Sequence, residues 1–163
     1  MKKLPMILLI FSPHAFAWLF LDLFLLSGNL PPVWPLIPAI YLLILFFNMV
    51  YAFVLPKLRY SSRKLLFWNM LLKLWNIPIY LSVFLFVLLT HVFSIPLIPF
   101  LFLFDYTLLL SSTSYGISGI LNGRKGKLLT PKAAIVNIIL QFLFCFDVFS
   151  AVYCYVKARK QGA

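Results

Sequence analysis

The sequence contains no glutamate, and only three aspartates stand against 14 lysines and arginines among its 163 residues. Without glutamate there is no HExxH zinc site and no glutamate-based intramembrane protease. A glycine-rich phosphate loop and a paired-aspartate phosphatidyltransferase pattern are also missing. The segment from Gly116 to Gly119 lacks the spacing of a nucleophile elbow. The sequence therefore predicts a protein that is not an enzyme.

Cysteine is equally scarce, which excludes a disulfide framework and a cysteine-based metal site. Cys145 and Cys154 are nine residues apart in one apolar stretch. A helix would separate them by about 13 Å, which is too far for a disulfide. No CxxC or Cys/His spacing is present. We expect no bound metal and no cofactor.

Charged residues make up only 10% of the chain, whereas a soluble domain carries about a quarter. Hydrophobic residues make up 64%, and the mean hydropathy is +1.04. Five apolar stretches are each long enough to cross a hydrocarbon core of about 30 Å. Strands are excluded because an open sheet cannot satisfy its edges in lipid. The sequence predicts one all-α transmembrane domain over residues 1–163, a bundle of five helices at approximately 4–27, 33–55, 65–94, 97–121 and 133–156.

The third stretch allows two interpretations, because it is longer than one perpendicular crossing and contains Lys73 and Pro78. In the first, residues 65–75 lie at the level of the lipid headgroups with Trp68 and Trp75 as interfacial aromatics, and the rest crosses. In the second, a single long tilted helix is kinked at Pro78.

The N-terminus also allows two interpretations. Two lysines, a short apolar core and the small residues Ala15 and Ala17 resemble a secretory signal peptide. The apolar run nevertheless continues without a break to Leu26, which is typical of an uncleaved first helix. We expect residues 1–17 to be retained, and cleavage would leave four helices.

The basic residues predict the orientation of the chain. With the N-terminus inside, ten Lys and Arg between the crossings lie inside and three lie outside, leaving out Lys73. The three outside are Lys157, Arg159 and Lys160, so either the tail breaks the rule or the last helix is re-entrant. Anionic headgroups on the cytoplasmic side account for the positive charge, and no nucleic-acid partner is expected.

The acidic residues all fall inside apolar stretches, where an ionised carboxylate costs about 3 kcal/mol or more. In the five-helix arrangement Asp22, Asp105, Asp147 and His91 all fall in the outer half of the membrane. Two interpretations follow. These four groups together form one site for a proton or a cation, or each lies separately within reach of water at the headgroups.

A polar stripe follows the third stretch at helical spacing, through Asn69, Lys73, Asn76 and Tyr80. Lys73 is expected to extend toward the inner headgroups. A buried ion pair with an aspartate is the alternative, but the predicted depths place the aspartates mostly in the other leaflet.

Small residues at the end of the fourth stretch predict a helix-packing seam. Ser112 and Gly116 are four residues apart, and Gly119 continues their face. Asp105 lies on the same face. In the fifth stretch the amides of Asn137 and Gln141 are also four residues apart and could meet this seam, which predicts a polar core between the two helices.

The last third of the chain resembles the C-terminal half of small, uncharacterised bacterial multi-pass membrane proteins, through residues 111–116, 137–142 and 145–148, with 73–78 as a further match. The resemblance implies a bacterial plasma membrane and no particular activity. Because helix contacts are what the sequence supplies, we expect an accessory, immunity or other interaction component that contacts a second membrane protein or its own copies. The alternative is a small ion-coupled carrier that uses the aspartates.

Overall fold

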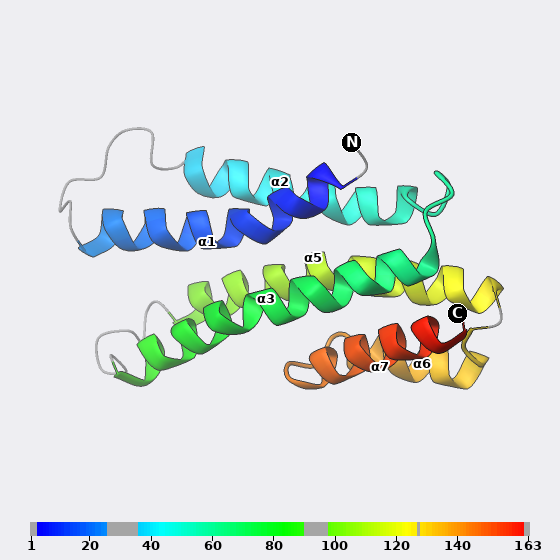
Figure 1. Ribbon diagram of the computed structural model, residues 1–163. Helices are drawn as coiled ribbons and strands as arrows, with labels where there is room; N and C mark the ends of the chain where they lie inside the picture. Colours follow the sequence, from blue (N-terminus) through cyan, green and yellow to red (C-terminus); the bar gives the residue numbers. More distant parts are fainter. Residues whose placement is uncertain (1–2, 26–35, 90–97, 127, 162–163) are drawn as a thin grey trace.

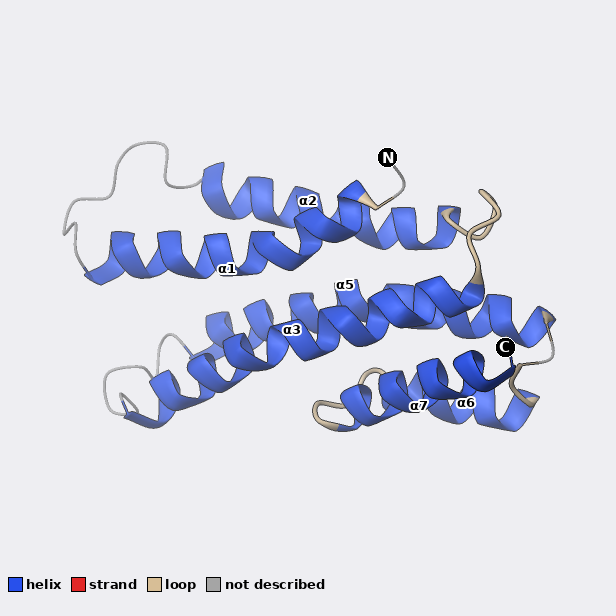
Figure 2. Cartoon of the chain, viewed as in Figure 1, coloured by secondary structure: helices blue, strands red, loops and turns tan. Residues whose placement is uncertain are grey.

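The computed structural model describes residues 3–25, 36–89, 98–126 and 128–161, and within these ranges it has six helices and no strand (Figure 2). The side chains of residues 20–25, 89 and 100 lie outside the description. The helices are α1 (Leu4–Leu25), α2 (Leu36–Val54), α3 (Ser62–Leu89), α5 (Ile98–Lys125), α6 (Pro131–Leu140) and α7 (Phe146–Gln161). The prediction of an all-helical chain is confirmed for the part of the chain that the structure describes.

The four long helices run roughly side by side, and the two short ones form a hairpin along one flank (Figure 1). Helix α3 is the central element, since it packs against α1, α5 and α7. Helix α2 packs against both α1 and α5 on the flank opposite the α6–α7 hairpin. Of the described helices, α2 and α3 are long and apolar enough to cross a membrane by length and composition.

Residues 65–89 of the third apolar stretch lie in one helix, α3, with Pro78 inside it. Residues 65–75 are thus continuous with the segment that was expected to cross, and residues 90–94 lie outside the described residues. Proline at position 78 has no N–H to donate to the preceding turn. The hydroxyl of Ser82 donates to the carbonyl oxygen of Pro78 at 2.7 Å.

The fifth apolar stretch is not one helix, so the prediction of a single helix over 133–156 is wrong. The chain leaves helical geometry at 141–145 and turns back, which makes α6 and α7 a helical hairpin (Figure 1). At the turn Cys145 has a φ of 70°, in the left-handed region. Helix α6 begins with a hydroxyl cap, since the side chain of Thr130 accepts from the N–H of Ala133, and Pro131 occupies the first helical position.

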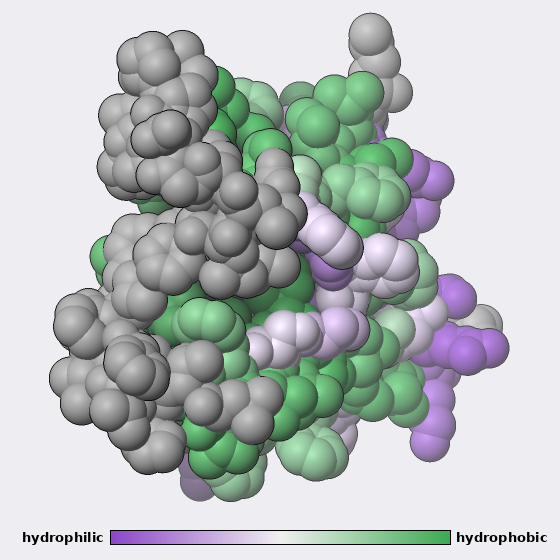
Figure 3. Space-filling view, turned by 90° about the vertical axis from the view of Figure 1, so that its left-hand side faces the viewer, coloured by the Kyte–Doolittle hydropathy of each residue, from purple (hydrophilic) through white to green (hydrophobic). Residues whose placement is uncertain are grey.

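The hairpin brings the basic segments of the chain to one end. Helices α1, α3 and α6 begin at the right-hand end of Figure 1, and α2, α5 and α7 finish there. Every described Lys and Arg except Lys73 belongs to these helix ends or to the segments that join them. Between the ends the surface carries large apolar side chains, and Figure 3 shows hydrophobic residues over much of the described surface.

Candidate functional site: a buried polar network

A buried ion pair joins the hairpin to the central helix. The Nζ atom of Lys73, on α3, lies 2.8 Å from Oδ2 of Asp147, in the first turn of α7. The two side chains are 0% and 2% exposed. Because each charge is removed from water, each depends on the other for its stabilisation. Lys73 was expected to extend to the inner headgroups, and the structure instead places it inside the bundle.

The reversal of the chain explains why the depths of Lys73 and Asp147 were predicted incorrectly. Lys73 lies 11 residues into α3, about 16 Å from its first residue. Asp147 was placed in the outer part of a continuous helix. Since α7 runs back toward the basic end, Asp147 lies about 21 Å from the last residue of α7, at a depth that Lys73 can reach.

Thr113 of α5 links the ion pair to the break between α6 and α7. Its Oγ1 accepts a hydrogen bond from Nζ of Lys73 at 3.2 Å and donates one to the carbonyl oxygen of Gln141 at 2.8 Å. Gln141 is the first residue after α6 and is fully buried. The hydroxyl therefore satisfies a backbone acceptor at the point where the helix stops.

Buried amides and a serine extend the network toward the basic end. Asn69 of α3 donates to Oε1 of Gln141 at 3.3 Å, and the amide of Gln141 donates to Ser150 at 3.4 Å. Ser150 donates to Oδ1 of Asn137 at 2.9 Å. Asn137 and Gln141 are therefore linked through Ser150 of α7. The sequence analysis treated α6 and α7 as one helix, so it did not predict this link.

The seam of small residues faces α3. A Cβ atom on Gly116 would lie 2.7 Å from Nδ2 of Asn69 and 2.8 Å from Oε1 of Gln141. One on Gly119 would lie 2.9 Å from the side chain of Leu66. Ser112 is fully buried, and its hydroxyl donates to the carbonyl oxygen of Leu109 in its own helix. Glycine at 116 thus leaves room for the amide contact between α3 and the hairpin.

A second polar seam, which was not predicted, joins α5 to α2. The hydroxyl of Tyr115 donates to Oδ1 of Asn48 at 2.8 Å, and Ser118 donates to the carbonyl oxygen of Ala52 at 2.6 Å. The sequence offered one signal, since Asn48 is a lone amide inside an apolar stretch. Such a residue usually bonds a neighbouring helix.

Of the three aspartates, the side chains of Asp105 and Asp147 are described, and these two lie in different surroundings. Asp105 lies eight residues before Thr113 on α5, about 12 Å along the helix. It was expected beside Asn137 or Gln141 and instead lies within electrostatic range of the phenols of Tyr41 and Tyr80. Its Oδ1 is enclosed and has no hydrogen-bond partner among the described residues. The side chain of Asp22 and all of His91 lie outside the described residues.

The two predicted interfacial tryptophans differ from each other. Trp68 is buried, and its indole N–H donates to the hydroxyl of Tyr60 at 3.0 Å. Trp75 is 45% exposed, and its ring contacts those of Phe11 and His14 on α1. Only Trp75 has an exposed position of the kind expected for an interfacial aromatic.

Two hollows lie outside the network. An apolar groove of about 370 Å³ lies between α1 and α2, and its lining includes Ser12 and Ala15. A hollow of about 710 Å³ at the basic end lies between the start of α3, the end of α7 and the turn after α5. Neither is lined by Lys73 or Asp147. The ion pair is thus enclosed by protein, away from both hollows.

No family model matches the chain, and no curated protein or solved structure matches it either. Its function has to be inferred from the network, the hollows and the distribution of charge.

Proposed function

We propose that this chain is a multi-pass protein of a bacterial plasma membrane, with four crossings and a re-entrant hairpin. Helices α1, α2, α3 and α5 cross, and the α6–α7 hairpin enters from the cytoplasmic side and returns to it. Both termini are then cytoplasmic. This replaces the arrangement of five crossings.

The distribution of basic residues is the observation that supports this topology. With the hairpin returning, the segment that carries Lys157, Arg159 and Lys160 lies at the same end as every other basic segment. The conflict with the positive-inside rule in the five-helix arrangement then disappears. Backbone that leaves helical geometry at membrane depth needs its polar groups satisfied within the protein. At the break the N–H groups of Phe142 and Leu143 donate to the carbonyl oxygens of Ile139 and Leu140, and Thr113 donates to that of Gln141.

Reporter fusions test the topology directly. Fusions after Tyr60, Lys127 and Lys160 should read cytoplasmic, and a fusion after Gly28 should read external. An external reading after Lys160 would refute the re-entrant hairpin, and an external reading after Tyr60 would invert the whole arrangement.

Within this topology the protein acts as an accessory component that contacts another membrane protein through the groove between α1 and α2. The groove is almost entirely apolar, and the small side chain of Ala15 is exposed in its lining. A small residue at such a place lets the backbone of an approaching helix come close. The ionic groups of Lys73 and Asp147, by contrast, already bind each other.

Affinity purification in mild detergent tests this function with a matched pair of variants. Ala15→Leu fills the groove and should remove a stoichiometric partner from the purified protein. Ala39→Leu adds the same bulk to α2 at an exposed position outside the groove and should leave the partner bound. Recovery of no partner with the unchanged chain, or equal recovery with both variants, would contradict the proposal.

A carrier function is the second candidate, and the enclosed carboxylate oxygen of Asp105 is the observation that favours it. An unpaired carboxylate inside a bundle is a place where a proton or cation can bind. Uptake by purified protein in liposomes should then depend on the proton or cation gradient. Asp105→Asn should abolish that dependence while leaving expression unchanged, and gradient-independent behaviour of the unchanged chain would refute this candidate.

A further inference from the structure

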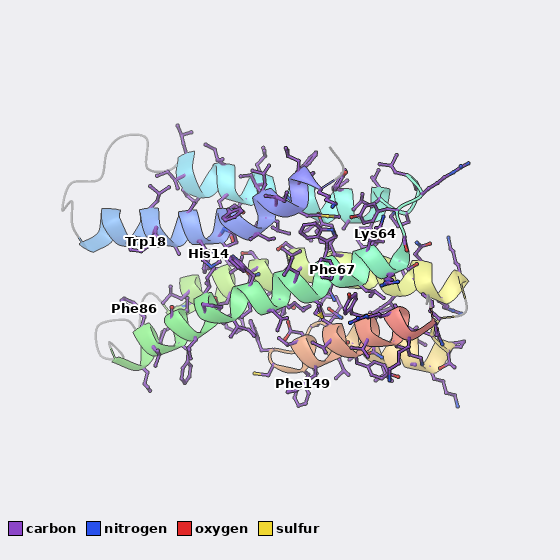
Figure 4. All side chains as sticks on the ribbon, in the orientation of Figure 1. His14, Trp18, Lys64, Phe67, Phe86 and Phe149 are labelled. Atoms are coloured by element: carbon purple, nitrogen blue, oxygen red, sulfur yellow. The ribbon has the colours of Figure 1, made fainter. Side chains whose placement is uncertain are left out.

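The hollow at the basic end has a lining that no part of the proposed function uses. It is formed by the segment from Tyr60 to Lys64, by aromatic side chains of α3 and α7, and by Lys3 near the N-terminus. Its cationic side chains are Lys3, Arg63 and Lys64, and its aromatic ones are Tyr60, Phe67, Trp68 and Tyr155. Lys64 and Phe67 lie together at the right-hand end of α3 in Figure 4.

Among the residues that the structure describes, no acidic side chain lines the hollow or lies beside these cations. None of the residues that line the hollow is acidic, and the sequence has only three acidic residues. Asp147 is bound to Lys73. Asp22 lies five turns into α1, and Asp105 lies about 30 Å from the basic end of α5. The positive charge of the hollow therefore attracts an anion from outside the chain.

The aromatic side chains indicate what kind of anion this is. Trp68 and Tyr60 are held by their mutual hydrogen bond, and the ammonium of Lys64 lies 5.9 Å from the centre of the Tyr60 ring. Aromatic rings and cations in the lining of one hollow match the boundary between acyl chains and headgroups. The serine hydroxyls of Ser61 and Ser62 add hydrogen-bond donors suited to phosphate oxygens.

We infer that this hollow binds the phosphate group of an anionic phospholipid from the cytoplasmic leaflet. Arg63, Lys64 and Lys3 would contact the phosphate. The aromatic side chains of the lining would contact the glycerol and the first part of the acyl chains. This inference rests on the proposed membrane placement. Reporter fusions test that placement independently, so the two failures are distinguishable.

The test compares two double variants that remove the same charges. R63Q/K64Q changes an adjacent Arg and Lys that line the hollow, and R124Q/K125Q changes an adjacent Arg and Lys at the same end of the molecule, outside the hollow. All four side chains are exposed, so neither variant should disturb folding. Native mass spectrometry of protein extracted from vesicles of phosphatidylglycerol and phosphatidylcholine measures the bound lipid.

The unchanged chain should retain phosphatidylglycerol over phosphatidylcholine, and R63Q/K64Q should weaken that retention by on the order of tenfold. R124Q/K125Q should change it by less than about twofold. Equal loss in both variants would mean a general charge effect and would overturn the inference. Stabilisation by inorganic phosphate in lipid-free detergent, without preference among lipids, would overturn the lipid assignment in favour of a soluble phosphate compound.

Discussion

Breaking the ion pair between Lys73 and Asp147 should cost far more stability than removing both charges together. Asp147→Asn removes the negative charge and leaves the ammonium of Lys73, which is 0% exposed, with only neutral acceptors, the new amide oxygen and the hydroxyl of Thr113. Removing one partner of a buried pair costs about 3–5 kcal/mol, because the remaining charge stays out of water without compensation. Lys73→Met should cost a similar amount by leaving the carboxylate of Asp147 alone.

The double variant K73M/D147N carries neither charge and should therefore recover much of this loss. Replacing a buried pair by neutral side chains of similar volume is often close to neutral in stability. We expect a coupling energy between the two positions of about 3 kcal/mol in the double-mutant cycle. Unfolding in mixed detergent and SDS micelles would measure it, with Lys132→Met, at an exposed lysine, as a control expected within about 0.5 kcal/mol of the unchanged chain. Additive single effects would refute the idea that the pair holds the hairpin against α3.

Three further changes test other parts of the structure by the same unfolding measurement. Gly116→Ala places a Cβ within 2.8 Å of both Asn69 and Gln141 and should destabilise the protein by about 1–3 kcal/mol. Gly119→Ala should cost less, because the nearest neighbour of its new Cβ is the flexible side chain of Leu66. The reverse order would contradict the packing described. Tyr115→Phe leaves Oδ1 of Asn48 without its donor and should cost about 1–3 kcal/mol, and no loss would mean that water or lipid replaces the bond. Cys145→Gly should stabilise by roughly 0.5–1 kcal/mol, because glycine adopts a φ of 70° without strain, and a loss of stability would mean that the side chain of Cys145 matters more than its backbone.

Much of the fold was predictable because apolar stretches bounded by turn residues mark helices clearly. The lengths of α2, α3 and α5 follow from composition alone, and the caps at Thr130 and Pro131 fixed the start of α6. The break at 141–145 was not predictable in this way, since the segment contains neither glycine nor proline. It is fixed by contacts from outside the segment, through Thr113 and the pair of Lys73 with Asp147.

The candidate site shows the same division between local and distant causes. The polar residues of α3, α5 and the last stretch were identified by their spacing, but their partners depended on the direction of α7. Once α7 runs back, Asp147 meets Lys73 and Asp105 is left apart from the amides. The basic residues of the tail were the one local signal of this reversal, because a continuous helix would put them on the side of the membrane opposite to the other basic segments.

The separation of Lys73 and Asp147 along the chain has a consequence for how the protein is made. In the proposed topology α3 leaves the ribosome with a lysine at its centre, and the aspartate that neutralises it follows 74 residues later. A lone lysine at that depth costs about 2.5–3.5 kcal/mol during insertion. We therefore expect α3 to insert less efficiently until the α6–α7 hairpin has been synthesised, because the hairpin supplies the aspartate that neutralises the lysine. A chain truncated after Thr130 should insert α3 inefficiently and be degraded, although it contains all four crossing helices.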